Sequence, residues 1–384
     1  YDDINAIKFL KTKFPKIKFI VFGYYPSLFY KEIIEYANID FITAGEPEYR
    51  IVAIIKNLYE NNEFNDGIIT PLNKEKKIDY FSLKRITNLD ELPPPDYKII
   101  NLSKYSEPFI SKPFATIYTT RGCAYNCAYC IHSYGHSYIA QSPDYVITQI
   151  KYLIDNFHIK SLRFMDDNFT TNQKRLSIIC EKLIAENINN SLTWTCLSRI
   201  DCLDEELIDI MANAGCRRIY IGIETLDKST NKIFNKEYQN LDMQKINKLL
   251  NYLQKKKIET FSFLLIDYDS YPRLKQKVDE FIKLDLDYIS VCKLIIYPNT
   301  ELFDKFQDKI EFSIIPYKNV FKDCEYEQTA VKIEKYAILK FYSKPKNLVK
   351  LFFRFFRYPL VSLNIIFSFC KYLIYTPNKK QDFI

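Results

Sequence analysis

The sequence predicts an α/β fold whose largest part is an open, six-stranded parallel barrel. Between residues 114 and 300, short apolar runs alternate six times with segments of helical periodicity. The runs are apolar on both faces, as is typical of parallel strands that helices cover on the outside. A helical segment between consecutive strands is what a parallel connection requires. Together these observations predict a (β/α)6 partial TIM barrel, about three quarters of the complete eight-stranded form.

A smaller α/β unit is expected before the barrel. Residues 17–22 and 39–43 are predicted strands, and residues 28–37 and 47–60 are predicted helices. Residues 1–61 are therefore interpreted as a strand–helix–strand–helix piece, half of a doubly wound domain. A unit of about 60 residues with two strands buries too little apolar surface to be comfortably stable alone.

Residues 62–113 are predicted to form an ordered connector. They contain the sequence LDELPPPD at 89–96. Three consecutive prolines can neither continue a helix nor join a central strand. We therefore interpret this segment as a tether that packs the first unit on the barrel.

Strands and helices alternate regularly from residue 114 onward. The third predicted helix is bounded clearly, because Asp204 is a good N-cap and Gly215 lies just past its end. Catalytic groups on such a scaffold are expected at the C-terminal ends of the strands. The predicted strands are 114–120, 161–166, 192–198, 217–223, 260–266 and 288–295, and the other predicted helices are 143–157, 172–187, 242–256 and 273–284.

The loop after the first barrel strand contains Cys123, Cys127 and Cys130, spaced C-x3-C-x2-C. Three thiolates at this spacing suit a metal site. Zinc is one candidate, with His132 or His136 as the fourth ligand. The other is a [4Fe–4S] cluster with three cysteine-bound irons and one open iron. The barrel context favours the cluster, while the remaining cysteines are interpreted as small buried residues in a reducing cytoplasm.

The sequence TTRGCAYNCAYC at 119–130, directly after a strand that opens a barrel, resembles the radical S-adenosylmethionine (SAM) superfamily. That superfamily has the same cysteine spacing with an aromatic residue before the last cysteine, here Tyr129. The resemblance covers 114–300. GEPE at 45–48 and the connector resemble the cobalamin-associated branch, which includes anaerobic magnesium-protoporphyrin ester cyclases and hopanoid and phosphonate methylases.

The resemblance implies a fold and a chemistry. Residues 1–61 would be a partial Rossmann-like domain of the cobalamin-binding type, and FYSKP at 341–345 matches an element of the helical tail that follows the barrel. The three cysteines would hold a [4Fe–4S] cluster whose open iron binds SAM. One electron from a flavodoxin or ferredoxin would release a 5′-deoxyadenosyl radical. The expected outcome is methylation or oxidative rearrangement of an unactivated carbon in an unidentified small-molecule or lipid-like substrate.

Further residues are expected to hold SAM. Asp166 and Asp167 end the second strand, where a carboxylate can accept from the ammonium group, although this turn could equally cap the next helix. Arg199 can grip a carboxylate with two parallel hydrogen bonds, or pair with the aspartate two residues later. Glu224 ends the fourth strand in IGIET, an element of the family, and a charge there needs a partner. Tyr129 would pack near the adenine, or simply pack the loop.

Several positions depart from the cobalamin-associated pattern. The chain contains no Asp-x-His-x-x-Gly element for the lower face of the corrin. Tyr24 stands where the family has a second glycine, and Asn299 replaces the glycine of a common Pro-Gly-Thr. The sequence begins at Tyr1 and is interpreted as a processed or truncated segment, which we expect to bind cobalamin poorly or not at all. A cobalamin-independent radical enzyme and a zinc-stabilised, non-catalytic module on a degenerate barrel remain the alternatives.

Residues 301–384 are predicted to be a helical, basic and amphipathic tail. The stretch LVKLFFRFFRY at 348–358 would lie on a membrane surface or cover the open side of the barrel. No run of about 18 apolar residues predicts a spanning helix, and a net charge of +7 is too dispersed to indicate nucleic acid. We therefore expect a cytoplasmic protein with peripheral membrane contact. The predicted apolar face consists of Leu348, Leu351, Phe352, Phe355 and Phe356, and the cationic face of Lys350, Arg354 and Arg357.

Overall fold

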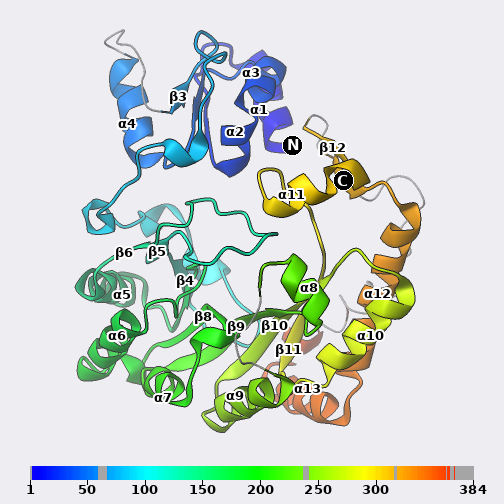
Figure 1. Cartoon of the computed structure of the whole chain (residues 1–384). Coiled ribbons are helices and arrows are strands. Elements are labelled where there is room, and N and C mark those ends of the chain that lie inside the picture. The colour runs from blue at the N-terminus through cyan, green and yellow to red at the C-terminus, as the bar shows by residue number, and fades with distance from the viewer. Residues whose placement is uncertain are drawn as a thin grey trace.

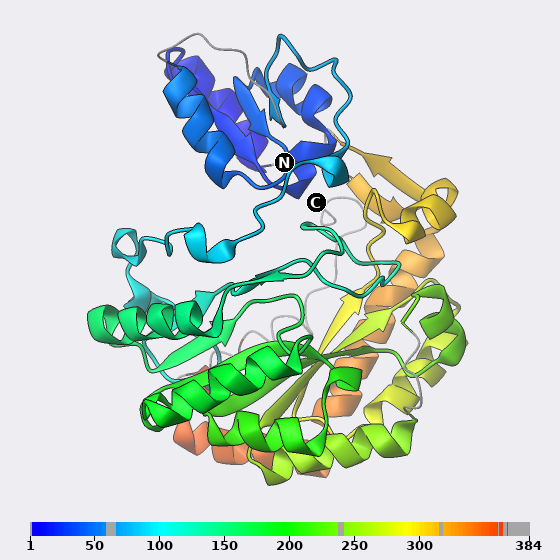
Figure 2. The same cartoon turned by 60° about the vertical axis from the view of Figure 1, so that its left-hand side comes forward.

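A six-stranded parallel sheet organises most of the chain. The computed structural model describes residues 2–58, 67–236, 242–314, 318–359, 361–363 and 367. The strands follow one another across the sheet in the order β11-β10-β9-β8-β7-β4, and helices cover its outer face (Figures 1 and 2). The fold is thus α/β with a mostly parallel sheet. The strands of this sheet are β4 (Phe114–Ile117), β7 (Ser161–Phe164), β8 (Thr193–Arg199), β9 (Cys216–Glu224), β10 (Glu259–Ile266) and β11 (Tyr288–Lys293).

The helices that connect these strands begin and end close to the predicted positions. Asp204 caps its helix as expected, since its carboxylate accepts a hydrogen bond from the backbone N–H of Leu207 at 2.8 Å. A short helix, α8, between the fourth and fifth strands was not expected. The helices are α5 (Pro143–Phe157), α6 (Gln173–Ala185), α7 (Glu205–Asn213), α8 (Lys228–Ile233), α9 (Met243–Lys255) and α10 (Tyr271–Ile282).

Alternation along each strand separates two environments. On β9, Ile219 and Ile221 are fully buried against the helices. Tyr220, between them, points to the inside of the curved sheet, where its ring lies 4.8 Å from that of Phe261 on β10. The phenol of Tyr288 on β11 continues this row, 6.0 Å from Phe261. The inside of the sheet is therefore lined by aromatic rings at this level.

The N-terminal residues form a separate, smaller sheet with its own core. Strand β1 (Ile20–Phe22) is parallel to β2 (Phe41–Thr43), as predicted. A third strand, β3 (Ile68–Ile69), is antiparallel to β2; it has two residues, too few for a sequence pattern. The first helix was also not expected, because only Ile4 of its side chains is buried and its apolar periodicity is weak. The helices here are α1 (Asp2–Lys13), α2 (Tyr24–Leu28), α3 (Tyr30–Ala37) and α4 (Glu48–Asn57).

The connector is built from single turns of 3-10 helix, such as Leu89–Glu91 and Tyr97–Ile99. The polar residue before each of these turns caps it; the side chain of Asn88, for example, accepts from the N–H of Asp90 at 3.2 Å. The connector reaches both ends of the barrel, and Figure 2 shows it between the N-terminal sheet and α5. The expected domain boundary at residue 61 lies outside the described residues.

The C-terminal part is less uniformly helical than predicted. It contains α11 (Glu301–Phe306), the antiparallel pair β12 (Ile310–Ser313) and β13 (Lys318–Phe321), α12 (Cys324–Tyr342) and α13 (Pro345–Arg357). FYSKP spans the end of α12 and the start of α13. Most of the apolar run 359–370 lies outside the described residues. Among the helices that the structure describes, none combines the length and apolar character needed to cross a membrane.

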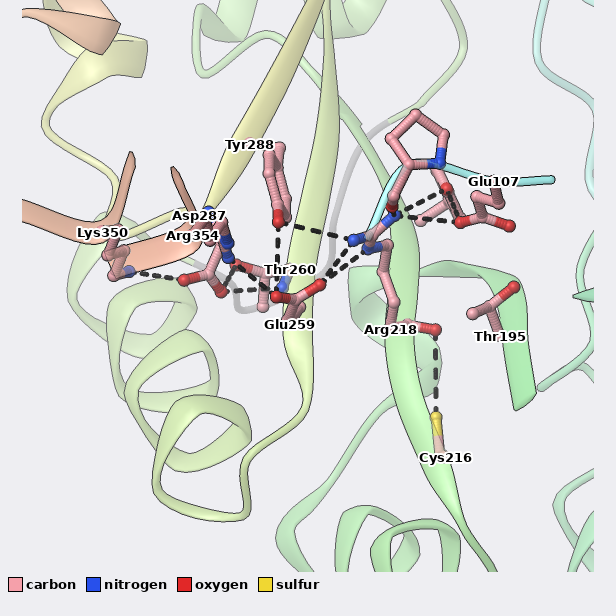
Figure 3. A network of polar contacts seen from close by, with 12 residues as sticks. Glu107, Thr195, Cys216, Arg218, Glu259, Thr260, Asp287, Tyr288, Lys350 and Arg354 are labelled. Carbon is pink, nitrogen blue, oxygen red and sulfur yellow. Dashed lines mark hydrogen bonds and ion pairs between the residues drawn. The ribbon is translucent and has the colours of Figure 1, made fainter. Parts of the chain in front are cut away.

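The predicted division of α13 into an apolar and a cationic face needs correction. Two of its cations point to the protein: Arg354 pairs with Glu259 at 2.7 Å and Lys350 pairs with Asp287 (Figure 3). Leu351 and Phe355 point the same way and line a cavity of about 370 Å³ at the N-terminal ends of the barrel strands. The acidic residues that begin strands β10 and β11 attract these cations. They are far from the helix in sequence, so the helical pattern alone could not reveal them.

Candidate active site at the cysteine loop

The cysteine loop leaves the C-terminal end of β4 and is closed at its base by a small antiparallel ladder. This ladder pairs β5 (Thr120–Arg121) with β6 (Ile139–Ala140). Gly122 has a φ of 80°, and a Cβ on it would lie 2.3 Å from the carbonyl oxygen of Ser137. Only glycine fits this crossing. The chain thus returns on itself and holds the three cysteines in one compact loop.

The three thiols share one site. Burial and the proximity of Cys127 raise the pKa of the Cys130 thiol to about 12. Burial likewise raises the pKa of Cys123, with further contributions from Asp167 and Cys127. All three cysteines are free thiols, and Cys130 remains accessible at its surface. The three thiols therefore lie on one loop, near a carboxylate from the end of β7.

A segment after α8 fastens the loop from the side. The carbonyl oxygen of Phe234 accepts a hydrogen bond from the N–H of Ala128 at 2.8 Å. The side-chain amide of Asn235 donates to the carbonyl oxygen of Asn126, also at 2.8 Å. These contacts flank Cys127 on both sides, so the end of α8 fixes the middle of the loop.

The next residue, Lys236, brings two of the predicted site residues together. Its ammonium forms an ion pair with Glu224 and donates to the Tyr129 hydroxyl at 3.2 Å. Lys236 is only 4% exposed. A Cβ on Gly222 would lie 2.9 Å from a carboxylate oxygen of Glu224 and 3.1 Å from the ammonium, so this glycine leaves room for the pair. Glu224 itself has a φ of 58°, which is unusual for a residue with a side chain.

Lys236 was missed by sequence reasoning. The chain is rich in lysine, and Lys236 lies in a segment without clear periodicity, so nothing in the pattern singles it out. Tyr129 does pack against the loop, with its ring 5.0 Å from that of Phe234 in an edge-on arrangement. Its hydroxyl contact with Lys236 shows that it also takes part in the polar cluster.

Arg199 reaches the site, but its carboxylate-binding edge is already engaged. Its Nε and Nη2 donate to the two carboxylate oxygens of Asp201 at 2.9 and 2.7 Å. The remaining nitrogen, Nη1, lies 3.4 Å from the sulfur of Cys127. The guanidinium also lies 4.0 Å from the ring centre of Tyr125. The structure therefore favours the alternative of an Asp201 partner. The arginine of this pair is buried, and its Nη1 faces Cys127.

The two aspartates at the end of β7 have different surroundings. Asp166 is fully buried, and its carboxylate accepts from the Thr119 N–H at 2.6 Å and the Thr120 N–H at 2.9 Å. Burial raises its pKa. Asp166 thus holds the start of the cysteine loop rather than facing the site. Asp167 is exposed at its surface and lies near the thiols of Cys123 and Cys130.

The histidines considered as zinc ligands face one another. The rings of His132 and His136 lie 4.1 Å apart, and Nδ1 of His136 lies 3.3 Å from the carbonyl oxygen of Tyr125. Ligands of one zinc ion each lie about 2.0–2.3 Å from it and so crowd together. Within the part of the chain that the structure describes, no three Cys, His, Asp or Glu side chains are grouped closely enough to hold a single ion.

The sequence from 117 to 270 matches the family model described as the radical SAM superfamily. The match begins at the last residue of β4 and includes all three cysteines. The chain carries a radical SAM domain. It is a radical SAM enzyme, and proteins similar to it are named as methyltransferases and as a cyclase.

Relatives of this radical SAM enzyme align over most of its length. An uncharacterized methyltransferase of Pyrococcus horikoshii is 27% identical over 91% of this chain and 78% of its own. The anaerobic magnesium-protoporphyrin IX monomethyl ester cyclase of Synechocystis is 27% identical over 59% of this chain, which spans 46% of the cyclase. The fold resembles that of the methyltransferase TsrM of Kitasatospora setae, whose structure was solved with cobalamin and a [4Fe–4S] cluster bound. The TM-score is 0.68 at 14% sequence identity, and the match covers 90% of this chain and 76% of TsrM.

The family implies a [4Fe–4S] cluster and SAM, and the donor set of this radical SAM enzyme fits both. Three thiols on one loop leave one iron of a cluster without a protein ligand. The charged groups beside them, Asp167, Glu224 and Lys236, include both signs. The methionine end of SAM carries an ammonium and a carboxylate, which such a set can bind.

The N-terminal sheet contacts the same loop through a buried ion pair. Arg121, two residues before the first cysteine, donates from Nη1 to Glu46 at 2.8 Å and from Nη2 to Glu48 at 2.5 Å. The second carboxylate oxygen of Glu46 accepts from the N–H of Ile86 in the connector. GEPE therefore joins three parts of the radical SAM enzyme beside its cysteine loop, a role that its sequence did not predict.

Two departures from the family pattern meet above the cysteine loop. The hydroxyl of Tyr24, on the N-terminal sheet, accepts a hydrogen bond from the amide of Asn299 at 3.4 Å. Asn299 has a φ of 63°, the conformation that glycine adopts most easily. The Tyr24 ring meets Tyr80 of the connector edge-on at 5.3 Å. Side chains from three parts of the chain thus fill this place.

Proposed function

We propose that this radical SAM enzyme cleaves SAM reductively at the cysteine loop and transfers the resulting radical to an apolar small molecule. The observation that carries the proposal is the C-x3-C-x2-C set of three thiols on the loop that follows the first strand of a six-stranded parallel sheet. When bound and reduced, the cluster supplies the electron that splits SAM into methionine and a 5′-deoxyadenosyl radical. An external reductant provides that electron.

Different residues of the chain bind the cluster and the parts of SAM. Cys123, Cys127 and Cys130 hold three irons and leave the fourth for SAM. Lys236 has a buried ammonium at the site and is placed to bind the methionine carboxylate. Glu224, held by Lys236, and the accessible Asp167 are placed to accept from the ammonium or the ribose hydroxyls. Arg199 orients the Cys127 side of the loop through its Nη1.

Replacing Lys236 by Met should weaken SAM binding while the cluster still assembles. The change removes a charge-assisted hydrogen bond and leaves Glu224 without its cation, so the Kd for SAM should rise about tenfold or more. Anaerobic calorimetry measures the Kd, and iron content reports the cluster. Lys236→Arg should recover part of the affinity. Lys232→Met, on the exposed side of α8, is the matched control and should bind SAM normally; an unchanged Kd for Lys236→Met would contradict the assignment.

The reaction that we propose is methylation or oxidative rearrangement of an unactivated carbon. The relatives named above are a methyltransferase and a cyclase, which supports this class. Tyr220, Phe261 and Tyr288 line a cavity of about 370 Å³ inside the curved sheet, towards the N-terminal ends of the strands. The aromatic lining of the interior favours an apolar substrate. We further propose that the enzyme works in the cytoplasm. We also propose domain boundaries at residues 61, 113 and 300.

A second candidate, radical chemistry without cobalamin, is favoured by the Tyr24 contact. The family resemblance places the cobalamin nucleotide close to a glycine at this position, whereas here Tyr24 contacts Asn299 and Tyr80. We expect the chain to retain less than about one tenth of an equivalent of hydroxocobalamin after desalting, because a ring occupies the approach. Visible absorption measures retention. If the unaltered chain retains one equivalent of hydroxocobalamin, and Tyr24→Gly retains no more, the cobalamin-dependent reaction is favoured instead.

Product analysis tests the proposed function directly. Anaerobically reconstituted enzyme, reduced with dithionite, should release 5′-deoxyadenosine and methionine in equal amounts from SAM. Chromatography with mass detection measures both. Stoichiometric zinc in place of iron, with no 5′-deoxyadenosine, would instead support the non-catalytic module.

A further inference from the structure

Helix α13 presents most of its apolar side chains to solvent. Its inner side is occupied by the ion pairs of Lys350 and Arg354 and by the almost fully buried Asn347. The outer face of α13, as we call it, consists of Leu348 (52% exposed), Val349 (54%), Phe352 (60%), Phe353 (67%) and Phe356 (68%). An amphipathic helix normally buries its apolar face and solvates its cations. Here the arrangement is reversed.

The outer face is continuous rather than scattered. Its members stand at positions i, i+1, i+4, i+5 and i+8, which share one side of a helix. Exposed apolar side chains continue beyond the helix at Leu363 and Phe367, which are 51% and 73% exposed. Single exposed apolar residues are ordinary, but a contiguous patch with several phenylalanines marks an interaction surface.

The charge of the chain is concentrated in the same region, contrary to the dispersed charge expected above. Residues 344–384 contain eight Lys and Arg and one Asp. The remaining residues, 1–343, contain 46 basic and 46 acidic side chains and are balanced. The net charge of +7 therefore comes from the segment that contains the outer face. Three of its cations, Lys346, Lys350 and Arg354, pair with carboxylates of the barrel, so the positive excess available to lipids comes from the rest of the segment. Such a combination of apolar surface and positive charge complements anionic lipids.

We propose that the outer face of α13 docks on the surface of an anionic phospholipid bilayer. Phenylalanine side chains would enter the boundary between headgroups and acyl chains, and the positive excess would favour anionic headgroups. A second copy of the chain fits less well, because it would bring together two segments that each have an excess of basic residues. Helix α13 lies at the N-terminal ends of the barrel strands, opposite the cysteine loop (Figure 1). Docking there leaves the cysteine loop accessible.

Vesicle flotation with the full chain tests this docking. The chain should float with vesicles of phosphatidylcholine containing phosphatidylglycerol and much less with phosphatidylcholine alone, and the bound fraction should fall as salt is raised. Phe352→Glu combined with Phe356→Glu should lower partitioning about tenfold or more. The matched control is Leu72→Glu with Ile99→Glu, two apolar residues that are 99% and 82% exposed elsewhere and receive the same charges. The control should float like the unaltered chain.

A second variant tests insertion without adding charge. Phe353→Trp places an indole on the outer face, and brominated acyl chains should quench its fluorescence. The only native tryptophan, Trp194, is 1% exposed and should not be quenched. Absence of quenching, or equal flotation of the double glutamate variant and the unaltered chain, overturns the proposal. The proposal is also overturned if the chain binds no vesicles but forms a concentration-dependent dimer that the glutamates abolish. A lower melting temperature of the glutamate variant without vesicles would overturn it too, because the outer face would then pack on another part of this chain.

Discussion

Replacing Cys127 by Ala should abolish SAM cleavage and leave the protein folded. The remaining two thiols cannot hold a four-iron cluster with a single open position, so iron and sulfide should fall to background. Release of 5′-deoxyadenosine should disappear with them. The loop should keep its shape, because the backbone contacts of Asn126 and Ala128 with the end of α8 do not involve the Cys127 side chain.

The measurement has three parts: iron and sulfide content, product formation, and circular dichroism. Cys292→Ala is the matched control, since Cys292 is also a free thiol but is exposed and lies on β11, outside the loop. It should retain iron and activity. If Cys127→Ala instead unfolds the chain and releases zinc, the loop is a structural zinc site, and the proposed function is wrong.

The largest effect on stability is expected from Arg218→Ala. Arg218 is 2% exposed and pairs with Glu107 at 3.0 Å and Glu259 at 2.5 Å (Figure 3). Its removal leaves the carboxylate of Glu107, which is also buried, without this partner. Breaking a buried ion pair by removing one member costs about 3–5 kcal/mol. The free energy of unfolding should fall by about that amount.

Urea denaturation measures this change, and the neighbouring residue provides a close control. Arg217, on the same strand, is exposed. Its guanidinium donates to the carbonyl oxygen of the neighbouring residue, Cys216. Arg217→Ala should change the free energy of unfolding by less than about 0.5 kcal/mol. A similar loss in both variants would show that the Arg218 network contributes little. Arg218→Met with Glu107→Gln should recover part of the loss, because it removes the buried carboxylate together with its buried cation, and the other partner of Glu107, Arg163, is only partly buried.

The barrel was predictable from sequence because each strand is a local pattern. The strand 217–223, for example, alternates between residues buried against helices and residues that face the inside of the sheet. The small N-terminal elements were harder. Helix α1 buries only Ile4, and β3 has two residues, so neither leaves a periodic pattern. The α/β class and the helix boundaries followed from local physics; the β12–β13 pair interrupts a tail that local patterns indicated as helical.

The candidate site was predictable only in its cysteines. Their spacing is local, whereas the partners of the other site residues come from elsewhere in the chain. Asp166 and Asp167 are adjacent in sequence, yet one is buried under Thr119 and the other lies by the thiols, and the strand pattern could not decide which. Lys236 could be found only from its place between Glu224 and Tyr129.

The connector fastens the molecule at two opposite ends. Near its start, Arg85 donates to the carbonyl oxygen of Ser137 beside the cysteine loop, and near its finish Glu107 holds Arg218 at the far end of the barrel. The exposed prolines, including Pro94, lie between these anchors. A protease that cuts at this exposed stretch would therefore leave two fragments that stay associated under native conditions and separate only in denaturant. The N-terminal sheet should therefore stay in place on the barrel rather than move as an independently tethered domain.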